Sequence, residues 1–143
     1  MASSLLHYSV LQKIEMMTMR HKMCSDEERL IRRIQCQNSR AKKAGLIGDL
    51  TVEQWKNCCD YFANKCAYCD KSAPLEIEHF NSLVNSGATT VGNILPACSA
   101  CNNAKNGINL KWFWSRLPED RKLLIYQYLL KYNTNEYLEA LLK

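Results

Sequence analysis

Apolar positions recur with helical spacing in the N-terminal part of the chain. Residues 5–23 carry one apolar stripe with a methionine-rich end, which predicts a helix that either packs on the core or contacts another molecule. A second helix is predicted over residues 25–45. Ser25 and Glu28 form a capping-box pattern at its start, and Gly45 is well suited to end it.

The central part of the chain changes from helical to alternating periodicity. Thr51 is a suitable N-cap for a third helix. The candidate buried residues of that helix are Trp55, Cys58, Cys59 and Phe62. Residues 75–80 alternate between apolar and polar side chains, which predicts a half-buried strand. Its two faces would carry Leu75, Ile77 and His79 on one side and Glu76, Glu78 and Phe80 on the other.

The second half of the chain predicts one more strand and several helices. Residues 81–92 are polar and rich in turn-forming residues, and therefore predict a loop. Residues 93–97 predict a second strand, which Pro96 confines to a sheet edge. Helical patterns begin after Cys101 and their aromatic side chains are predicted to lie in the core. They cover residues 101–105, 109–117, 118–132 and 137–142, with residues 133–136 as a separator.

The positive charge of the chain is concentrated in its N-terminal third. The net charge is +5, and residues 1–48 contain nine lysines and arginines against four acidic residues. Residues 49–143 contain ten of each kind. The basic side chains of the second helix either form a solvated face or follow the phosphates of a nucleic acid. They are Arg29, Arg32, Arg33, Arg40, Lys42 and Lys43.

Eight cysteines include two Cys-x-x-Cys pairs with 28 residues between them. Such pairs indicate metal binding rather than disulfides in a chain whose start does not resemble a signal peptide. Four thiolates can hold one Zn²⁺ tetrahedrally. The four cysteines are Cys66, Cys69, Cys98 and Cys101, and the other cysteines are interpreted as packing or incidental thiols. We expect a cytoplasmic protein, because paired cysteines of this kind favour a reducing compartment, and we expect no transmembrane helix.

Hard oxygen donors and a histidine lie between and after the cysteine pairs. A closed zinc site would draw Glu78, His79 and the amide of Asn102 into one small region. A carboxylate with an amide oxygen favours Mg²⁺ or Mn²⁺. An imidazole with a pKa of about 6.5 can act as a general base near neutral pH.

The order of these motifs resembles the HNH, or ββα-metal, endonucleases, and in particular the HNN variant with a four-cysteine zinc site. The first cysteine pair, Glu78-His79, the segment 93–98 and the segment 101–105 carry the resemblance, which covers about residues 51–117. It implies an α+β fold with a ββα-metal (His-Me finger) core, flanked by N- and C-terminal helices, and a protein of a bacterial or phage-infected cell. We therefore expect a helical, basic arm (1–50), a nuclease core (51–117) and C-terminal helices that pack on the core (118–143).

The resemblance also implies roles for individual residues. The four cysteines of the two pairs would bind the structural zinc. His79 would be the general base, Glu78 and Asn102 would bind the catalytic Mg²⁺ or Mn²⁺, and Asn93 would tie the long loop and help to orient the histidine ring. Lys105 is either a solvated lysine or a phosphate contact, and Asn106 is a further candidate ligand or DNA contact.

Simpler interpretations remain for several of these residues. His79 could be a core histidine, and Asn102 could only cap the helix after the knuckle. The leading hypothesis is a hydrolase that cuts double-stranded DNA by nicking one strand or cutting both. The alternative is a non-catalytic zinc-binding module that docks DNA or protein. The predicted partners are DNA, a second copy of the chain through the methionine-rich helix, and a phage packaging or recombination protein, but no membrane.

Overall fold

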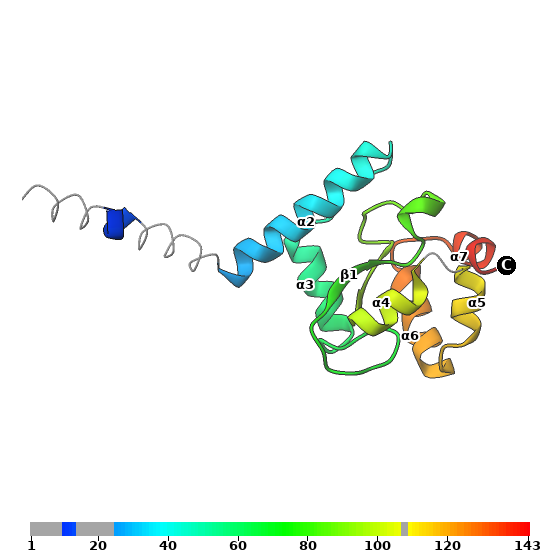
Figure 1. The fold of residues 1–143 in the computed structure, drawn as a ribbon. Helices are drawn as coiled ribbons and strands as arrows, with labels where there is room; N and C mark the ends of the chain where they lie inside the picture. Colours follow the sequence, from blue (N-terminus) through cyan, green and yellow to red (C-terminus); the bar gives the residue numbers. More distant parts are fainter. Residues whose placement is uncertain (1–9, 14–24, 107–108) are drawn as a thin grey trace, which may run out of the picture. The chain divides into compact units, whose positions relative to one another are not determined.

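The computed structural model describes residues 10–13, 25–106 and 109–143, and the chain divides into two compact units, residues 1–33 and 34–143 (Figure 1). In the first unit, residues 10–13 are helical, as predicted, whereas the methionine-rich segment 16–23 lies outside the described residues. Helix α2 (Asp26–Lys43) begins where the sequence predicts, because Ser25 Oγ accepts a hydrogen bond from Glu28 N at 3.1 Å. Helix α2 continues from the first unit into the second.

Helix α3 (Val52–Tyr61) confirms both the predicted cap and the predicted buried face. Thr51 Oγ1 accepts from Gln54 N at 3.1 Å, while Gln54 Oε1 accepts from Thr51 N at 3.0 Å, which completes a capping box. The four residues expected on its inner face are all buried. This helix packs against the second strand of the sheet and ends four residues before the first Cys-x-x-Cys pair.

Two short strands form the sheet at the centre of the second unit. Strand β1 (Glu76–His79) pairs antiparallel with β2 (Ile94–Ala97), and Glu78 lies opposite Leu95. The loop between them includes a 3₁₀ turn, η1 (Leu83–Asn85). Strand β2 is buried along its whole length because α3 covers it. Its outer edge is closed by a hydrogen bond from Ala67 N to Pro96 O at 2.8 Å.

The remaining helices are α4 (Ser99–Lys105), α5 (Leu110–Ser115), α6 (Glu119–Leu130) and α7 (Asn135–Leu142). Two of them begin earlier than predicted. Helix α4 begins at Ser99 because the thiol of Cys98 accepts from Cys101 N. Helix α7 begins within the segment predicted to be a separator, because Thr134 Oγ1 caps it by accepting from Tyr137 N at 3.2 Å.

The hydrophobic core joins α3, the sheet and the C-terminal helices. Phe113 and Tyr128 are buried in it, as predicted for the C-terminal aromatics. The exceptions are Trp112, Tyr132 and Tyr137, because 47%, 45% and 43% of their surfaces are exposed. The α+β class and the strand–strand–helix order expected from the resemblance are confirmed. The predicted boundaries after residues 50 and 117 stay predictions.

Among the described residues, no helix combines the length and the apolar composition that a membrane span requires.

Candidate functional site

The two Cys-x-x-Cys pairs come together into one cluster of four thiols. Cys66 and Cys69 lie in the turn after α3, Cys98 follows β2, and Cys101 lies in the first turn of α4. Their sulfur atoms all lie within 4.8 Å of one another, and Cys69 Sγ is 3.8 Å from Cys98 Sγ. A tetrahedral site with Zn–S bonds of about 2.3 Å places its sulfurs about 3.8 Å apart. The cluster therefore has the size and the donor atoms of a structural zinc site.

An arginine from a distant helix supports the cysteine turn. Arg121 in α6 is 7% exposed, and its Nε donates to Ala67 O at 2.9 Å. Its Nη1 also contacts Asp70 Oδ1 at 3.2 Å. Asp70 has a positive φ of 60°, which allows the chain to turn back after Cys69. Helix α6 thus holds the turn that presents the first two thiols.

One face of β1 directs two carboxylates toward helix α4. Asn102 Nδ2 donates to Glu76 Oε2, and Lys105 Nζ donates to Glu78 Oε1, each at 2.6 Å. The hydroxyl of Tyr68 donates to the second oxygen of Glu78. Because a carboxylate only accepts hydrogen bonds, Glu76 fixes the orientation of the Asn102 amide, with Nδ2 toward the strand and Oδ1 as the opposite end.

Glu78 and Lys105 form a buried ion pair, with exposures of 5% and 4%. Burial raises the pKa of Glu78 above its ordinary value, and the charge of Lys105 together with the hydrogen bonds from Lys105 and Tyr68 opposes this rise. Burial, with a contribution from Glu78, also raises the pKa of Tyr68 well above its ordinary value, so Tyr68 remains a hydrogen-bond donor. Lys105 Nζ donates further to His79 O at 2.6 Å. The carboxylate is thus held in one position between strand and helix.

His79 lies on the other face of β1. Its Nε2 is 2.8 Å from the hydroxyl oxygen of Thr89, in the loop that returns to β2. Burial, together with the positive charges of Arg40 and Lys105, lowers the pKa of His79 to about 4. The imidazole is therefore neutral at pH 7, and the ordinary pKa assumed from the sequence is too high.

Asn93 ties the loop between the strands at both of its ends. Its Oδ1 accepts from Asn81 N at 2.8 Å, and its Nδ2 donates to Asn81 O at 2.9 Å and Ala88 O at 2.8 Å. Gly87 is required at this point, since a Cβ there would lie 1.8 Å from Asn81 O. The predicted function of Asn93 in tying the loop has a direct counterpart in these contacts, and its role in catalysis stays a prediction.

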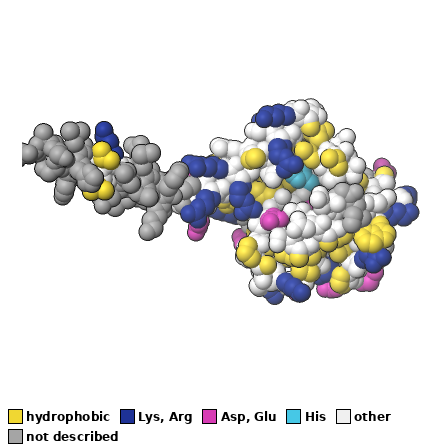
Figure 2. Space-filling model, in the orientation of Figure 1, with side chains coloured by type: hydrophobic (Ala, Val, Ile, Leu, Met, Phe, Trp, Pro, Cys, Tyr) yellow, Lys and Arg dark blue, Asp and Glu magenta, His cyan; other side chains and the backbone are white. Residues whose placement is uncertain are grey.

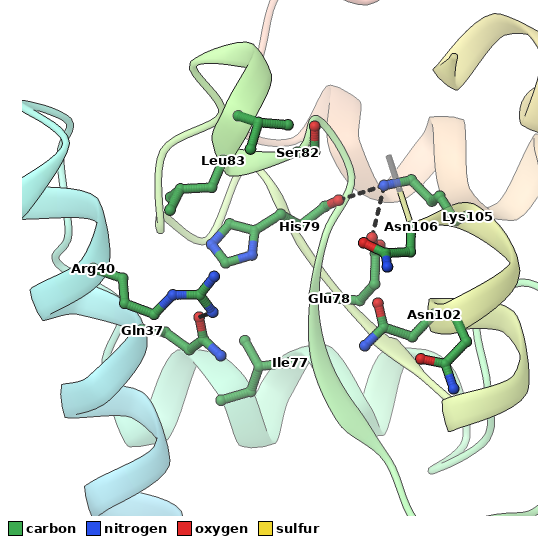
Figure 3. Close-up of a pocket in the computed structure, with 12 residues that line it drawn as sticks. Gln37, Arg40, Ile77, Glu78, His79, Ser82, Leu83, Asn102, Lys105 and Asn106 are labelled. Carbon is green, nitrogen blue, oxygen red and sulfur yellow. Dashed lines mark hydrogen bonds and ion pairs between the residues drawn. The ribbon is translucent and has the colours of Figure 1, made fainter. Parts of the chain in front are cut away.

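The residues from both faces of β1 line one cavity of about 380 Å³ (Figure 3). Glu78, His79, Asn102 and Lys105 all contribute to its wall, so the structure brings these predicted site residues together, whereas Asn93 is not part of the wall. Figure 3 shows Arg40 of α2 beside the His79 ring on one side of the strand, with Glu78 and Lys105 on the other side. On the space-filling surface, a histidine side chain is accessible next to basic side chains (Figure 2).

Two of the simpler interpretations are wrong. Lys105 is not a solvated lysine, because it is buried and paired with Glu78. Asn102 does not cap α4, because Cys98 occupies the N-cap position and Asn102 lies inside the helix. Asn106 is the C-cap residue of α4 and also lines the cavity.

Several residues of the site are missing from the sequence-based prediction. Tyr68 and Glu76 contact the predicted ligands, Thr89 contacts the histidine, and Gln37 of α2 lines the cavity. Only Glu76 had a signal in the sequence, because strand alternation places it on the same face as Glu78. The others depend on contacts between distant segments.

Comparison with known proteins identifies one family. Residues 66–107 match the family described as HNH endonuclease, a range that contains all four clustered cysteines, Glu78, His79 and Asn102. No solved structure matches the chain.

One curated relative also matches. A protein of Bacillus subtilis (strain 168) named "SPbeta prophage-derived putative HNH endonuclease YoqL" is 30% identical to this chain over 96 residues. The aligned region is 57% of this chain and 42% of that protein, so the chain spans less than half the length of this relative.

Proposed function

Because residues 66–107 match the HNH endonuclease family, we propose that this chain is a metal-dependent endonuclease that hydrolyses phosphodiester bonds in DNA. One observation carries the proposal: a single cavity joins a neutral imidazole to a carboxylate and an amide held on α4 and β1. An imidazole that lines a cavity beside two hard oxygen donors is placed to act on a bound ligand, so this arrangement favours a hydrolytic site over a structural one.

In this proposal His79 is the general base. Its neutral ring takes a proton from a water molecule, the water oxygen attacks the phosphorus, and the bond to the leaving sugar oxygen breaks while a second water molecule protonates that oxygen. With a pKa lowered to about 4 the ring is unprotonated at pH 7 and has a free lone pair for a proton, although it is a weaker base than an exposed histidine. Asn93 positions the base indirectly, since it fixes the loop that contains Thr89.

Glu78 and Asn102 are proposed to hold the catalytic Mg²⁺ or Mn²⁺. The donor set fits such an ion: the Asn102 amide turns its nitrogen to Glu76, which leaves the oxygen as its donor end, and each Glu78 oxygen has a second lone pair besides the one its partner uses. A bound divalent cation would stabilise the charge that develops on the scissile phosphate. Lys105 keeps the Glu78 carboxylate in position beside it.

The four-thiol cluster is proposed to bind a structural zinc ion. Because Cys98 ends β2 and Cys101 begins α4, a zinc ion would fix the angle at which α4 leaves the sheet. That angle determines where Asn102 lies relative to Glu78. The zinc would therefore organise the catalytic site without taking part in the reaction.

The basic residues of α2 are proposed to bind DNA phosphates. Arg40 lines the cavity, and Lys42 and Lys43 lie in the last turn of the same helix. The proposed contacts of Arg29, Arg32 and Arg33 rest on their charge alone. Lys105 is buried in its pair with Glu78, so its proposed contact would be with a phosphate inside the cavity that it lines. A single site would nick one strand, and cutting both strands would require a second copy of the chain. The prophage origin in the relative's name supports a phage-related role.

The test is cleavage of supercoiled plasmid by zinc-loaded protein in Mg²⁺ or Mn²⁺, with nicked and linear products separated on a gel. We expect the wild type to nick the plasmid only with the added cation. His79→Ala should retain zinc, fold and DNA binding but lose about 10²- to 10⁴-fold in rate. His21→Ala, which removes an imidazole outside the family match, is the matched control. A wild type that never cuts with either ion would favour the non-catalytic docking module.

A further inference from the structure

The hydroxyl of Thr89 connects the imidazole of His79 to helix α2. Thr89 Oγ1 lies 2.8 Å from His79 Nε2 and donates to the backbone carbonyl of Gln37 at 3.2 Å. Thr89 is fully buried, so water does not compete for its hydroxyl. The three groups thus form a chain of hydrogen bonds from the strand to the helix.

The direction of these two hydrogen bonds follows from the number of protons that each group can donate. A threonine hydroxyl has one proton to donate, whereas a carbonyl can only accept. Since the proton of Thr89 points to Gln37 O, the hydroxyl presents a lone pair to His79. Nε2 must then carry the ring proton of the neutral imidazole, and the basic lone pair is on Nδ1.

Two hydrogen bonds also hold the backbone of Thr89 in position. Its N donates to Ile47 O at 2.9 Å, and its O accepts from Asp49 N at 3.1 Å. Between these two residues, Gly48 approaches α2 so closely that a Cβ would lie 2.3 Å from Asn38 O. Thr89 therefore has little freedom to move away from the ring or from α2.

We propose that Thr89 is a positioning residue for the general base, which selects the Nε2–H tautomer of His79 and so leaves Nδ1 to accept the proton of the attacking water. The inference deepens the proposed nuclease function and rests on it. It also gives helix α2 a second function besides contact with phosphates, because the carbonyl of Gln37 determines the direction of the hydrogen-bond chain.

The tautomer can be measured without any cleavage. We would label the zinc-loaded protein with ¹⁵N-histidine and record long-range ¹H–¹⁵N correlations at pH 7.5, with His79 assigned by comparison with His79→Ala. We expect a protonated Nε2 and an unprotonated Nδ1 in the wild type. Thr89→Val should convert this signal to a mixture of tautomers and reduce plasmid nicking up to about tenfold at unchanged zinc content. Thr89→Ser should restore both the tautomer and the rate.

Thr90→Val is the matched control, because it makes the same substitution one residue along, where the backbone carbonyl contacts Asn93 N. It should leave the tautomer of His79 unchanged. A wild-type ring protonated at Nδ1 would overturn the proposal, even if Thr89→Val failed to fold. A Thr89→Val protein that keeps the wild-type tautomer of His79 and the wild-type nicking rate would also overturn the proposal. A wild type with the expected tautomer but no cleavage would instead contradict the nuclease function and leave the hydrogen-bond chain in place.

Discussion

The second unit contains two candidate metal sites that differ in their donor atoms and in how the chain builds them. The thiol cluster takes all of its donors from two short motifs, each of which places two cysteines three positions apart. The cavity beside β1 takes its residues from α2, β1, the loop after β1 and α4. Sulfur donors suit zinc, whereas carboxylate and amide oxygens suit Mg²⁺ or Mn²⁺.

This difference separates a structural function from a chemical one. In the cluster, four ligands complete the coordination of a tetrahedral ion, which leaves no position for a substrate. In the cavity, Glu78 and Asn102 would leave positions for water and a phosphate oxygen. In the proposed function a zinc ion in the cluster would fix where α4 lies, and α4 provides one side of the cavity, so the second site would depend on the first.

The largest expected effect is the loss of one thiol from the cluster. Cys98→Ser should unfold the second unit, because structural zinc contributes on the order of 10 kcal/mol or more and domains of this size are stable by about 5–15 kcal/mol. Circular dichroism and zinc content would measure it. Cys36→Ser, at an exposed position of α2, is the control and should remain folded. A folded Cys98→Ser protein without zinc would show that the cavity does not depend on the cluster.

A smaller effect is expected from the buried ion pair at the cavity. Lys105→Met would leave the Glu78 carboxylate buried without its cation, and should cost about 3–5 kcal/mol in urea unfolding. The double variant Glu78→Met/Lys105→Met should cost less than the sum of the two single variants. Lys122→Met, which breaks a pair with the exposed Glu119, should cost less than about 1 kcal/mol. Equal costs for Lys105→Met and Lys122→Met would contradict the account.

The smallest expected effect is on the pH dependence of the free energy of unfolding. The pKa of His79 is lowered to about 4 in the folded protein, whereas an unfolded histidine has a pKa of about 6.5. The unfolded chain therefore binds a proton first as the pH falls, and stability decreases through this window. Between pH 7.5 and pH 5.5 we expect the wild type to lose about 1 kcal/mol more than His79→Gln. An identical pH dependence of the two proteins would show that the imidazole is not desolvated.

The sequence was sufficient for features that depend on neighbouring residues. The capping box at Thr51, the strand predicted over 75–80 and the spacing of the cysteines are local patterns, and each predicts the observed element. The expectation that the strand is half-buried is wrong, because Glu78 on its polar face is buried against Lys105. The starts of α4 and α7 were placed too late for a local reason as well. A cysteine thiol is an unusual cap, and Thr134 lies within a polar cluster that equally suits a loop.

The partners of the site residues could not be predicted, because they come from distant segments. Lys105 is a charged residue at the end of a short helix, and nothing near it in sequence indicates that it lies against Glu78. Thr89 lies in a polar loop, where a threonine is normally solvated, yet it is fully buried between β1 and α2. Such contacts follow only from the packing of α2 and α4 around the strand.

The most direct test of the central claim, that the cavity is a hard-cation site distinct from the thiol cluster, is titration of zinc-loaded protein with Mn²⁺ followed by electron paramagnetic resonance. We expect one Mn²⁺ per chain. Asn102→Ala, which leaves the Glu78–Lys105 pair in place, should weaken binding about tenfold or more without loss of zinc. Asn103→Ala, one position along the same helix, should bind Mn²⁺ as the wild type does. Equal Mn²⁺ affinity in the wild type and in Asn102→Ala would contradict the claim.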